Sequence, residues 1–308
     1  MNYDYLERVD RHVLMHPQLS QALKTIEKAI ISSASSKNPV NVLLTGDAGT
    51  GKTTTCQKIL SKYPRKQVST ELGENTIIPA FYSLIPAPAT IRSVGEGMLQ
   101  KLLTTGGLGG TTSEITVQLG QQLKHRQTKV IMLDELQHLL NGDRRTHDVR
   151  NWIKHINNEY KVPLVVVGMP ECAQVINDDD QLARRFPYQV KLTNFEAPSP
   201  ENTLFVEYLM SLLSVFEAEA KVSINLNPTK YLDAFSVYLA TGGNPSQMTA
   251  LLKEAVSNAK MEERKNVEKK DFENAVYSLT LHARKTRSNP FSQGDETLKA
   301  LINQLTQA

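Results

Sequence analysis

Eight consecutive residues constrain this chain more than any others. They match the pattern G-x-x-x-x-G-K-[ST] without a mismatch and read Gly46-Asp47-Ala48-Gly49-Thr50-Gly51-Lys52-Thr53. Glycines let the backbone curve closely around a polyphosphate and point its N–H groups inward. In this pattern the lysine reaches the β- and γ-phosphates, and the threonine hydroxyl is a ligand for Mg²⁺. We therefore expect this loop, together with Thr54, to bind ATP, and Thr53 to contact Mg²⁺.

The residues on either side of the loop favour the same interpretation. Residues 40–45 form a short aliphatic and β-branched run, typical of a buried strand. Residues 53–62 have helical spacing, with Ile59 and Leu60 on the apolar face. A strand, a loop and a helix in this order place phosphates at a helix N-terminus, where free N–H groups and the helix dipole favour anions.

A second stretch supplies the acidic groups that such a loop needs. Four apolar residues, 130–133, are followed directly by Asp134 and Glu135. At the end of a buried strand Asp134 is suited to hold Mg²⁺, and Glu135 to polarise a water for attack on the γ-phosphate. Gln137 and His138 follow closely, and a supporting role is open for either. For His138 the polar face of a helix start explains the residue equally well.

The order of apolar runs predicts an α/β fold. Strand-like runs alternate with helix-like segments at Val42–Thr45, Ile77–Leu84, Val130–Leu133, Leu164–Val167 and Tyr188–Leu192. This alternation is typical of a parallel sheet with helices on both faces. After the breaker at residues 197–200 the pattern becomes mostly helical, with helices expected over 202–216, 228–240, after 245 and from about 270. We expect an N-terminal helical lead over 1–39, with a connector at 32–39, a nucleotide-binding domain over 40–196, a helical domain over 197–282 and a basic, polar tail over 283–308.

Bulk composition narrows the class of protein only a little. The 308 residues carry a formal charge of +3, which permits a nucleic-acid partner without establishing one. No apolar run reaches the length of a membrane span, and the N-terminus has no secretory pattern. The two cysteines, Cys56 and Cys172, lack metal-ligand spacing and fit reduced core thiols. We expect a cytoplasmic protein that does not enter a membrane.

Three further passages carry a resemblance to a known family. They are Val162 to Glu171 followed by Asp180 to Phe186, Leu136 to Gly142 after the acidic pair, and Arg11 to Pro17 near the N-terminus. With the nucleotide motifs, they make the chain resemble the AAA+ ATPases from about residue 8 to 281. Within these ATPases it looks most like the TnsC/TniB transposition regulators.

This resemblance implies a fold, a function and further site residues. It implies an AAA+ P-loop domain with a small C-terminal helical lid. It also implies an ATP-dependent regulator of transposition that forms rings or helical filaments on duplex DNA and links target-site selection to the transposase. Lys52 and Glu135 would be catalytic, and Arg185 would be an arginine finger that reaches the nucleotide of a neighbouring subunit. Arg184 is the alternative finger. Another reading pairs Arg185 with Asp178, Asp179 or Asp180 at a helix end.

Two positions depart from the common AAA+ pattern. Met169 stands where a polar residue often contacts the attacking water, and Ser246 or Gln247 stands where many members have arginine. Both changes favour slow ATP hydrolysis that times assembly. A nucleotide-gated scaffold with little hydrolysis is therefore the main alternative. A secretion-type AAA+ ATPase is another, although no membrane or wall-binding segment is visible.

The resemblance also places DNA contacts between the second strand and Asp134. Lys101 and Thr112 are the residues that we expect to contact DNA phosphates, and such contacts are independent of sequence. Other cationic residues are open to the same role or to that of a solvated helix face: Arg92, Lys124, His125, Arg126, Lys129, Arg144, Arg145 and Lys154. No aromatic residues are interleaved with them, which disfavours binding to single strands. The basic tail over 284–287 is open as a further DNA or partner contact.

Overall fold

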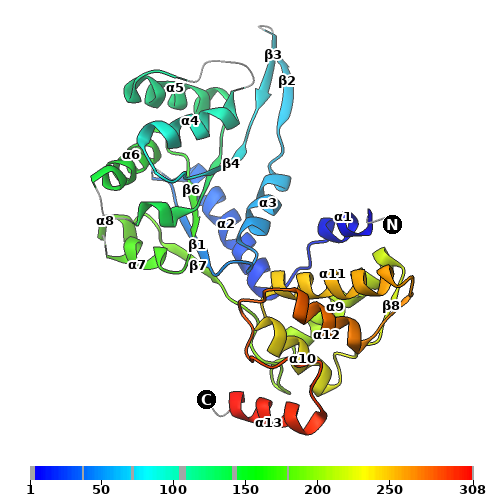
Figure 1. Ribbon diagram of the computed structural model, residues 1–308. Coiled ribbons are helices and arrows are strands. Elements are labelled where there is room, and N and C mark those ends of the chain that lie inside the picture. Colours follow the sequence, from blue (N-terminus) through cyan, green and yellow to red (C-terminus); the bar gives the residue numbers. More distant parts are fainter. Residues whose placement is uncertain are drawn as a thin grey trace. The chain divides into compact units, whose positions relative to one another are not determined.

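The chain divides into two compact units, which we describe separately (Figure 1). The computed structural model describes residues 4–36, 38–70, 73–103, 109–140, 144–178 and 180–306. The sheet unit comprises Pro17–Ala48 and Lys52–Leu192, and the helical unit comprises Met1–His16, Gly49–Gly51 and Thr193–Ala308. The finer domain boundaries expected from the sequence stay a prediction.

A parallel β-sheet of five strands forms the centre of the described sheet unit. Its strand order is β4 (Ala80–Leu84), β5 (Val130–Asp134), β6 (Leu164–Gly168), β1 (Val42–Gly46) and β7 (Tyr188–Leu192). Every residue of β1, β5 and β6 is buried, as the nearly continuous apolar runs predict for strands covered on both faces. The expected α/β fold class is confirmed.

Helices cover both faces of this sheet (Figure 1). α2 (Pro17–Ser35) and α3 (Lys52–Lys62) pack against β1 on one side. On the other side Leu43 shares a core with side chains of α4 (Ile91–Leu102) and α6 (Arg144–Tyr160). The same core receives residues from α5, the 3₁₀ helix η1, α7 and α8, which span Thr112–His125, Leu136–Leu139, Cys172–Asn177 and Asp180–Ala183.

The strand register gathers the functional loops at one edge. Leu133 of β5 and Leu43 of β1 both pair with Val166 of β6, so the three central strands are aligned with one another. Because the strands are parallel, their carboxyl ends all meet the same side of the sheet. The nucleotide-binding loop, Asp134 and the end of β6 therefore share this carboxyl edge.

Three local features differ from the expectation. The expected strand Ile77–Leu84 is interrupted by Pro79, which has no N–H and whose carbonyl accepts from Lys129 at 2.7 Å. Before the interruption, β2 (Lys66–Thr70) and β3 (Gly73–Ile77) form an unexpected antiparallel hairpin. α2 also continues to Ser35, through the residues expected to be a connector. Its Ser33 hydroxyl donates to Ala29 O at 2.8 Å and accepts from Val40 N at 2.8 Å.

The helical unit has its own apolar core, centred on Phe205, Phe216 and Phe272. Its helices are α1 (Asp4–Arg11), α9 (Leu204–Ala220), α10 (Tyr231–Thr241), α11 (Pro245–Met261), α12 (Lys269–Ser278) and α13 (Asp295–Thr306). The strands β8 (Ser223–Ile224) and β9 (Asn266–Val267) pair in parallel. The helices expected after residue 200 are confirmed, and α1 adds Tyr5 and Val9 to the core.

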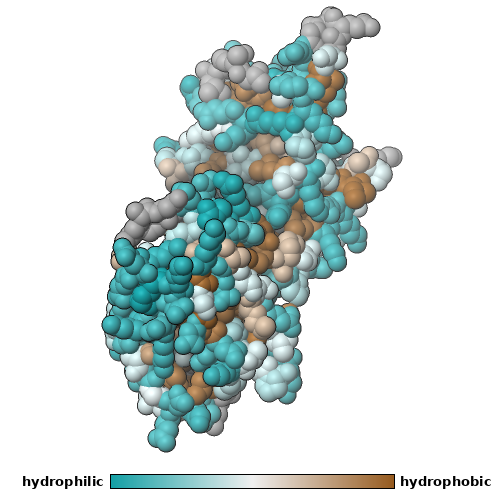
Figure 2. Space-filling model, turned by 90° about the vertical axis from the view of Figure 1, so that its right-hand side faces the viewer, coloured by the Kyte–Doolittle hydropathy of each residue, from teal (hydrophilic) through white to brown (hydrophobic). Residues whose placement is uncertain are grey.

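In the part of the chain that the structure describes, no helix combines the length and the apolar character needed to cross a membrane. The face drawn in Figure 2 is mostly hydrophilic, with smaller hydrophobic areas between. Cys56 and Cys172 are both free thiols and both buried, which confirms the reading of core cysteines.

Candidate nucleotide site

The loop over residues 46–53 leads from the end of β1 into α3. Gly49 and Gly51 have φ of +81° and +101°, a region that glycine enters without steric cost. The Lys52 ammonium donates to the carbonyls of Gly46 at 2.6 Å and Asp47 at 2.9 Å. Its charge is thus held over the loop backbone, at the place where a polyphosphate would lie.

The start of α3 adds a second attraction for anions. The helix begins at Lys52, so the first N–H groups of its 11 residues have no partner within the helix. Thr53 is exposed and Thr54 is half-buried in this first turn. Free N–H groups and the positive end of the helix dipole together favour a bound phosphate.

Asp134 ends β5 with a carboxylate fixed by two donors. Its Oδ1 accepts from the Glu135 N–H at 2.7 Å, and its Oδ2 accepts from the Tyr82 hydroxyl at 2.5 Å. The residue is only 6% exposed, so both oxygens keep a defined direction. Burial, then the hydrogen bond and the charge of Asp134, raises the pKa of Tyr82, which remains a donor at physiological pH.

The residues at this edge fit a magnesium ion that arrives with its nucleotide. Thr53 and Asp134 offer the hard oxygen atoms that Mg²⁺ prefers. Among the described residues, no group of three or more His, Cys, Asp and Glu side chains forms a metal cage. Mg²⁺ is commonly held by one or two protein ligands with substrate phosphates and water, so a separate cage is not required.

Glu135 occupies an uncommon backbone conformation directly after Asp134. Its φ of 65° and ψ of 39° lie in the left-handed region, which non-glycine residues rarely enter and which is found disproportionately at functional sites. Its Oε2 accepts a hydrogen bond from Gln137 Nε2. The ring of His138 points elsewhere, because its Nδ1 donates to Ile85 O at 2.6 Å. His138 therefore ties η1 to the chain after β4, which is a structural role.

Arg185 lies at the opposite edge of the sheet. Its carbonyl accepts from Asn41 N at 3.3 Å, just before β1, and its guanidinium donates to Asn158 at the end of α6. Because β7 pairs Tyr188 with Val42 and Leu192 with Gly46, the length of β1, about 13 Å, separates this edge from the nucleotide loop. Arg184 is exposed, and both arginines line a shallow cavity with Asn38 and Pro39. Asp179 lies outside the described residues, so pairing at the helix end stays open.

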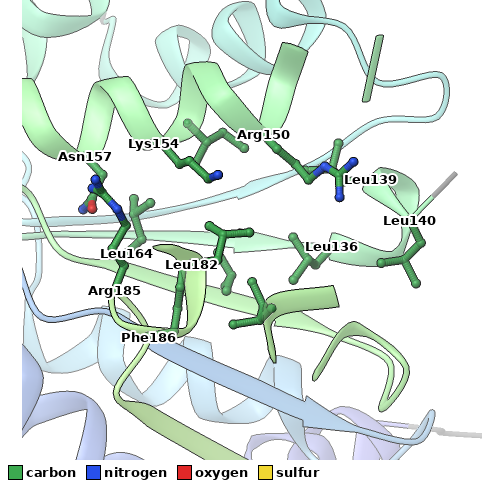
Figure 3. Close-up of a pocket in the computed structure, with 13 residues that line it drawn as sticks. Leu136, Leu139, Leu140, Arg150, Lys154, Asn157, Leu164, Leu182, Arg185 and Phe186 are labelled. Carbon is green, nitrogen blue, oxygen red and sulfur yellow. The ribbon is translucent and has the colours of Figure 1, made fainter. Parts of the chain in front are cut away.

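A separate apolar pocket lies beside Arg185 (Figure 3). Arg150 and Lys154 of α6 face Leu136 and Leu182 across it. Its cavity volume is about 40 Å³, and its lining includes none of residues 46–53, Asp134 or Glu135, so it is distinct from the nucleotide loop.

The two residues expected to contact DNA lie on different helices. Lys101 is exposed near the end of α4, where its carbonyl accepts from Arg65 Nη2 at 2.8 Å at the base of the β2–β3 hairpin. Arg126, at the end of α5, donates to Thr76 O of the same hairpin at 3.1 Å. Thr112 starts the 14-residue α5 and is therefore about 20 Å from that end. Residues 104–108, between Lys101 and Thr112, lie outside the described residues.

Within the helical unit, the loop tip Gly49–Gly51 contacts the start of α11. Ser246 N donates to Gly49 O at 3.3 Å, and Asn244 caps the helix by accepting from Gln247 N at 3.1 Å. A Cβ at Gly49 would lie 2.6 Å from Asn244 Oδ1. A backbone donor at Ser246 thus reaches Gly49, and Ser246 is one of the two residues compared in the sequence with an arginine of many AAA+ proteins.

The role of Tyr82 at this site was not predicted from the sequence, and a supporting role for Gln137 was left open. The sequence contains a weak signal for Tyr82, because this residue lies near the end of a predicted strand that finishes at the same carboxyl edge. Gln137 has none, since its contact with Glu135 depends on the left-handed conformation of Glu135.

The family model described as Bacterial TniB protein matches residues 6–197. Among curated proteins, no sequence matches this chain.

Solved structures share the fold at low sequence identity. The Aeropyrum pernix ORC1 protein, solved in complex with DNA, is 16% identical with a TM-score of 0.59, covering 86% of this chain and 66% of its own. The Aeropyrum pernix ORC2 protein, in ADPNP–ADP complexes, is 15% identical with a TM-score of 0.63, covering 88% and 71%. The Thermotoga maritima RuvB Holliday junction branch migration motor is 15% identical with a TM-score of 0.51, covering 93% and 81%. These likenesses show the fold of the AAA+ P-loop ATPases, with a helical C-terminal part.

Proposed function

Because this chain belongs to the bacterial TniB family, whose model matches residues 6–197, we propose that it is an ATP-dependent regulator of transposition. In this proposal it assembles on target duplex DNA and links target-site selection to the transposase. It acts in the cytoplasm, where ATP and target DNA are both present.

Family and fold support ATPase activity, and one observation carries the assignment of residues. The nucleotide-binding loop and the acidic pair, Asp134 and Glu135, meet at the same edge of an aligned parallel sheet. Lys52 and the N–H groups of α3 bind the phosphates, while Thr53 and Asp134 hold the metal. Bound Mg²⁺ neutralises charge on the phosphates. Glu135 orients a water and takes its proton.

The position of Arg185 supports a site that is completed by a second copy. At the opposite edge of its own sheet, Arg185 cannot reach the loop of its own chain. A planar, permanently charged guanidinium from a neighbour suits the charge that develops on the phosphate. A ring or a helical filament supplies such a neighbour to the interior subunits.

Binding to duplex DNA rests on exposed cations of the sheet unit. Lys101, Arg65 and Lys66 are exposed around the base of the β2–β3 hairpin, and Thr112 marks the start of α5. Such side chains suit phosphates of any sequence, so binding would weaken steeply as salt rises.

Paired measurements on wild type and Glu135→Gln test the proposal. Wild type should hydrolyse ATP, Glu135→Gln should be strongly impaired, and both should form ATP-dependent assemblies on random duplex DNA in electron micrographs. If both proteins are equally inactive while ATP still drives assembly, the proposal of an ATPase is wrong. The protein would then be a nucleotide-gated scaffold. Met169 and Ser246 favour that alternative, since neither supplies the expected polar or charged side chain. DNA binding that persists unchanged at high salt, or that needs no nucleotide, would refute the DNA part.

A further inference from the structure

Gln137 bridges two elements at the carboxyl edge of the sheet. From η1 its amide nitrogen donates to Glu135 Oε2, and its amide oxygen accepts from Met169 N at 3.4 Å. Met169 directly follows β6, so the side chain of Gln137 connects the ends of β5 and β6.

The contact to Met169 fixes which end of the amide faces Glu135. A backbone N–H can only donate, so it selects the amide oxygen of Gln137 and turns the amide nitrogen toward the carboxylate. Glu135 Oε2 is thereby occupied by a donor, whereas no bond to Oε1 is recorded among the described residues. One oxygen is held, and the other is available to accept a proton.

The residues around this amide leave space for it. A Cβ added to Gly168 would lie 3.3 Å from Gln137 Oε1 and 2.6 Å from Cys172 Sγ. The absence of a side chain at Gly168 therefore lets Gln137 reach the end of β6. The side chain of Met169 offers no hydrogen-bond donor, so the polar group at this edge comes from η1 instead.

We propose that Gln137 is a positioning residue for ATP hydrolysis, which holds Glu135 in the orientation that accepts a proton from the attacking water. This inference rests on the role proposed for Glu135. In the step, a water proton passes to Glu135 Oε1 while the water oxygen bonds to the γ-phosphorus. The bond from the γ-phosphorus to the bridging oxygen breaks, ADP and phosphate leave, and Glu135 returns its proton to solvent.

Two substitutions separate positioning from packing. Gln137→Glu keeps the size of the side chain but removes the donor, whereas Gln137→Ala removes both. We expect each to lower kcat by about tenfold or more, because general-base catalysis is worth about 10²–10⁴-fold and depends on geometry. The KM for ATP and the affinity for a fluorescent ATP analogue should stay near wild type. Gln174→Glu, the same charge change at an exposed position of α7, should leave kcat unchanged.

A double mutant identifies the residue through which Gln137 acts. If Gln137 positions Glu135, adding Gln137→Ala to Glu135→Gln should lower kcat no further. The inference is overturned if Gln137→Glu matches wild type, since the amide would then serve packing alone. It is also overturned if the Gln137 variants lose nucleotide binding. Wild-type activity of Glu135→Gln would refute the role of Glu135 itself, whereas an inactive Glu135→Gln with fully active Gln137 variants would refute only the present inference.

Discussion

Cys56 lies in the second turn of α3, close behind the nucleotide-binding loop. Burial raises the pKa of its thiol to about 12, and the charge of Asp134 adds to the shift. Burial likewise raises the pKa of Cys172 to about 11. A thiol with a raised pKa holds its proton through the physiological range, so neither residue is a nucleophile in the folded protein.

This predicts that both thiols resist alkylation in the native state. At pH 8 the thiolate fraction of Cys56 would be about one in ten thousand, and that of Cys172 about one in a thousand. Mass spectrometry after iodoacetamide treatment should find both cysteines unmodified in buffer and both modified in urea. Rapid native labelling would show that one of these sites is accessible.

The sequence predicts the identity of single site residues better than their orientation. Lys52, Thr53, Asp134 and Glu135 follow from local patterns, and the structure places all four at the carboxyl edge of the sheet. The left-handed conformation of Glu135 has no sequence signal, because only the surrounding fold stabilises it.

At the scale of elements, a buried pair of asparagines joins β1, α6 and β6. Asn41 and Asn157 donate to each other at 3.1 and 3.0 Å, and Asn41 Oδ1 also accepts from Leu164 N at 2.9 Å. Both residues are at most 2% exposed. Together they satisfy backbone and side-chain groups where the amino edge of the sheet is closed to water.

Asn41→Ala should therefore destabilise the protein. It leaves Leu164 N–H and the Asn157 amide without their partner, which costs about 2 kcal/mol of unfolding free energy. Urea denaturation measures this loss. Exposed Asn151→Ala, on the same helix, is the matched control and should change stability by less than about 0.5 kcal/mol. Equal losses in both variants would contradict the role given to the buried pair.

A second element, α1, is held to α9 by an acid-sensitive contact. His12 Nε2 lies 2.9 Å from Glu219 Oε1, and Arg8 Nε donates to Glu219 Oε2 at 2.8 Å. Hydrogen bonds from His12 and then Arg8 lower the pKa of Glu219. A carboxyl group with a lowered folded-state pKa stabilises the fold above its unfolded pKa, and this contribution is lost as pH falls through the folded pKa.

When the pH falls below about 4.5, near the ordinary pKa of a glutamate, we expect the backbone amides of α1 to lose their protection from hydrogen exchange before those of the other helices. Hydrogen exchange of residues 4–11 should accelerate there. Glu219→Gln should show fast exchange already at pH 7, and Glu7→Gln, which alters only the exposed pair with Arg11, should not. Exchange in Glu219→Gln equal to wild type would show that other contacts, among them Tyr5, Val9 and the Asp10–Lys253 ion pair, are enough to retain α1.

Elements with apolar strands were predictable, and the polar hairpin was not. β1, β5 and β6 lie within one residue of their expected positions, because buried parallel strands leave continuous apolar runs. β7 also lies at its expected position, although it is an edge strand in which apolar and polar residues alternate. The described residues of β2 are all exposed, so no alternation of apolar and polar residues marks the strand. The extension of α2 through Ser33 was hidden for a different reason. Serine-rich segments usually form turns or connectors, yet here the Ser33 hydroxyl donates to a carbonyl of the preceding helical turn.

At the scale of the whole molecule, the proposed arginine finger predicts complementation between two inactive proteins. Arg185→Ala and Glu135→Gln should each lose most ATPase activity when alone. In an equal mixture, about a quarter of the interfaces would join an intact Glu135 to an intact Arg185, so activity should return to about a quarter of wild type.

The same mixture discriminates the alternatives. Arg184→Ala, tested in parallel, should remain active if Arg185 is the finger. If Arg184→Ala is the inactive variant and it complements Glu135→Gln, the finger is Arg184. A mixture with no recovery, from proteins that assemble normally, would show that the arginine does not act across a subunit interface.

In the open form of the proposed assembly, the separation of Arg185 from its own nucleotide-binding loop would produce two unlike ends. At one end the arginine of a subunit would have no neighbour to act on, and at the other a subunit would hold ATP that no arginine reaches. The second of these would keep its ATP longest, while interior subunits hydrolyse theirs. Growth and loss of subunits would then proceed at different speeds at the two ends, which gives the assembly a direction along DNA that the symmetric double helix itself does not provide.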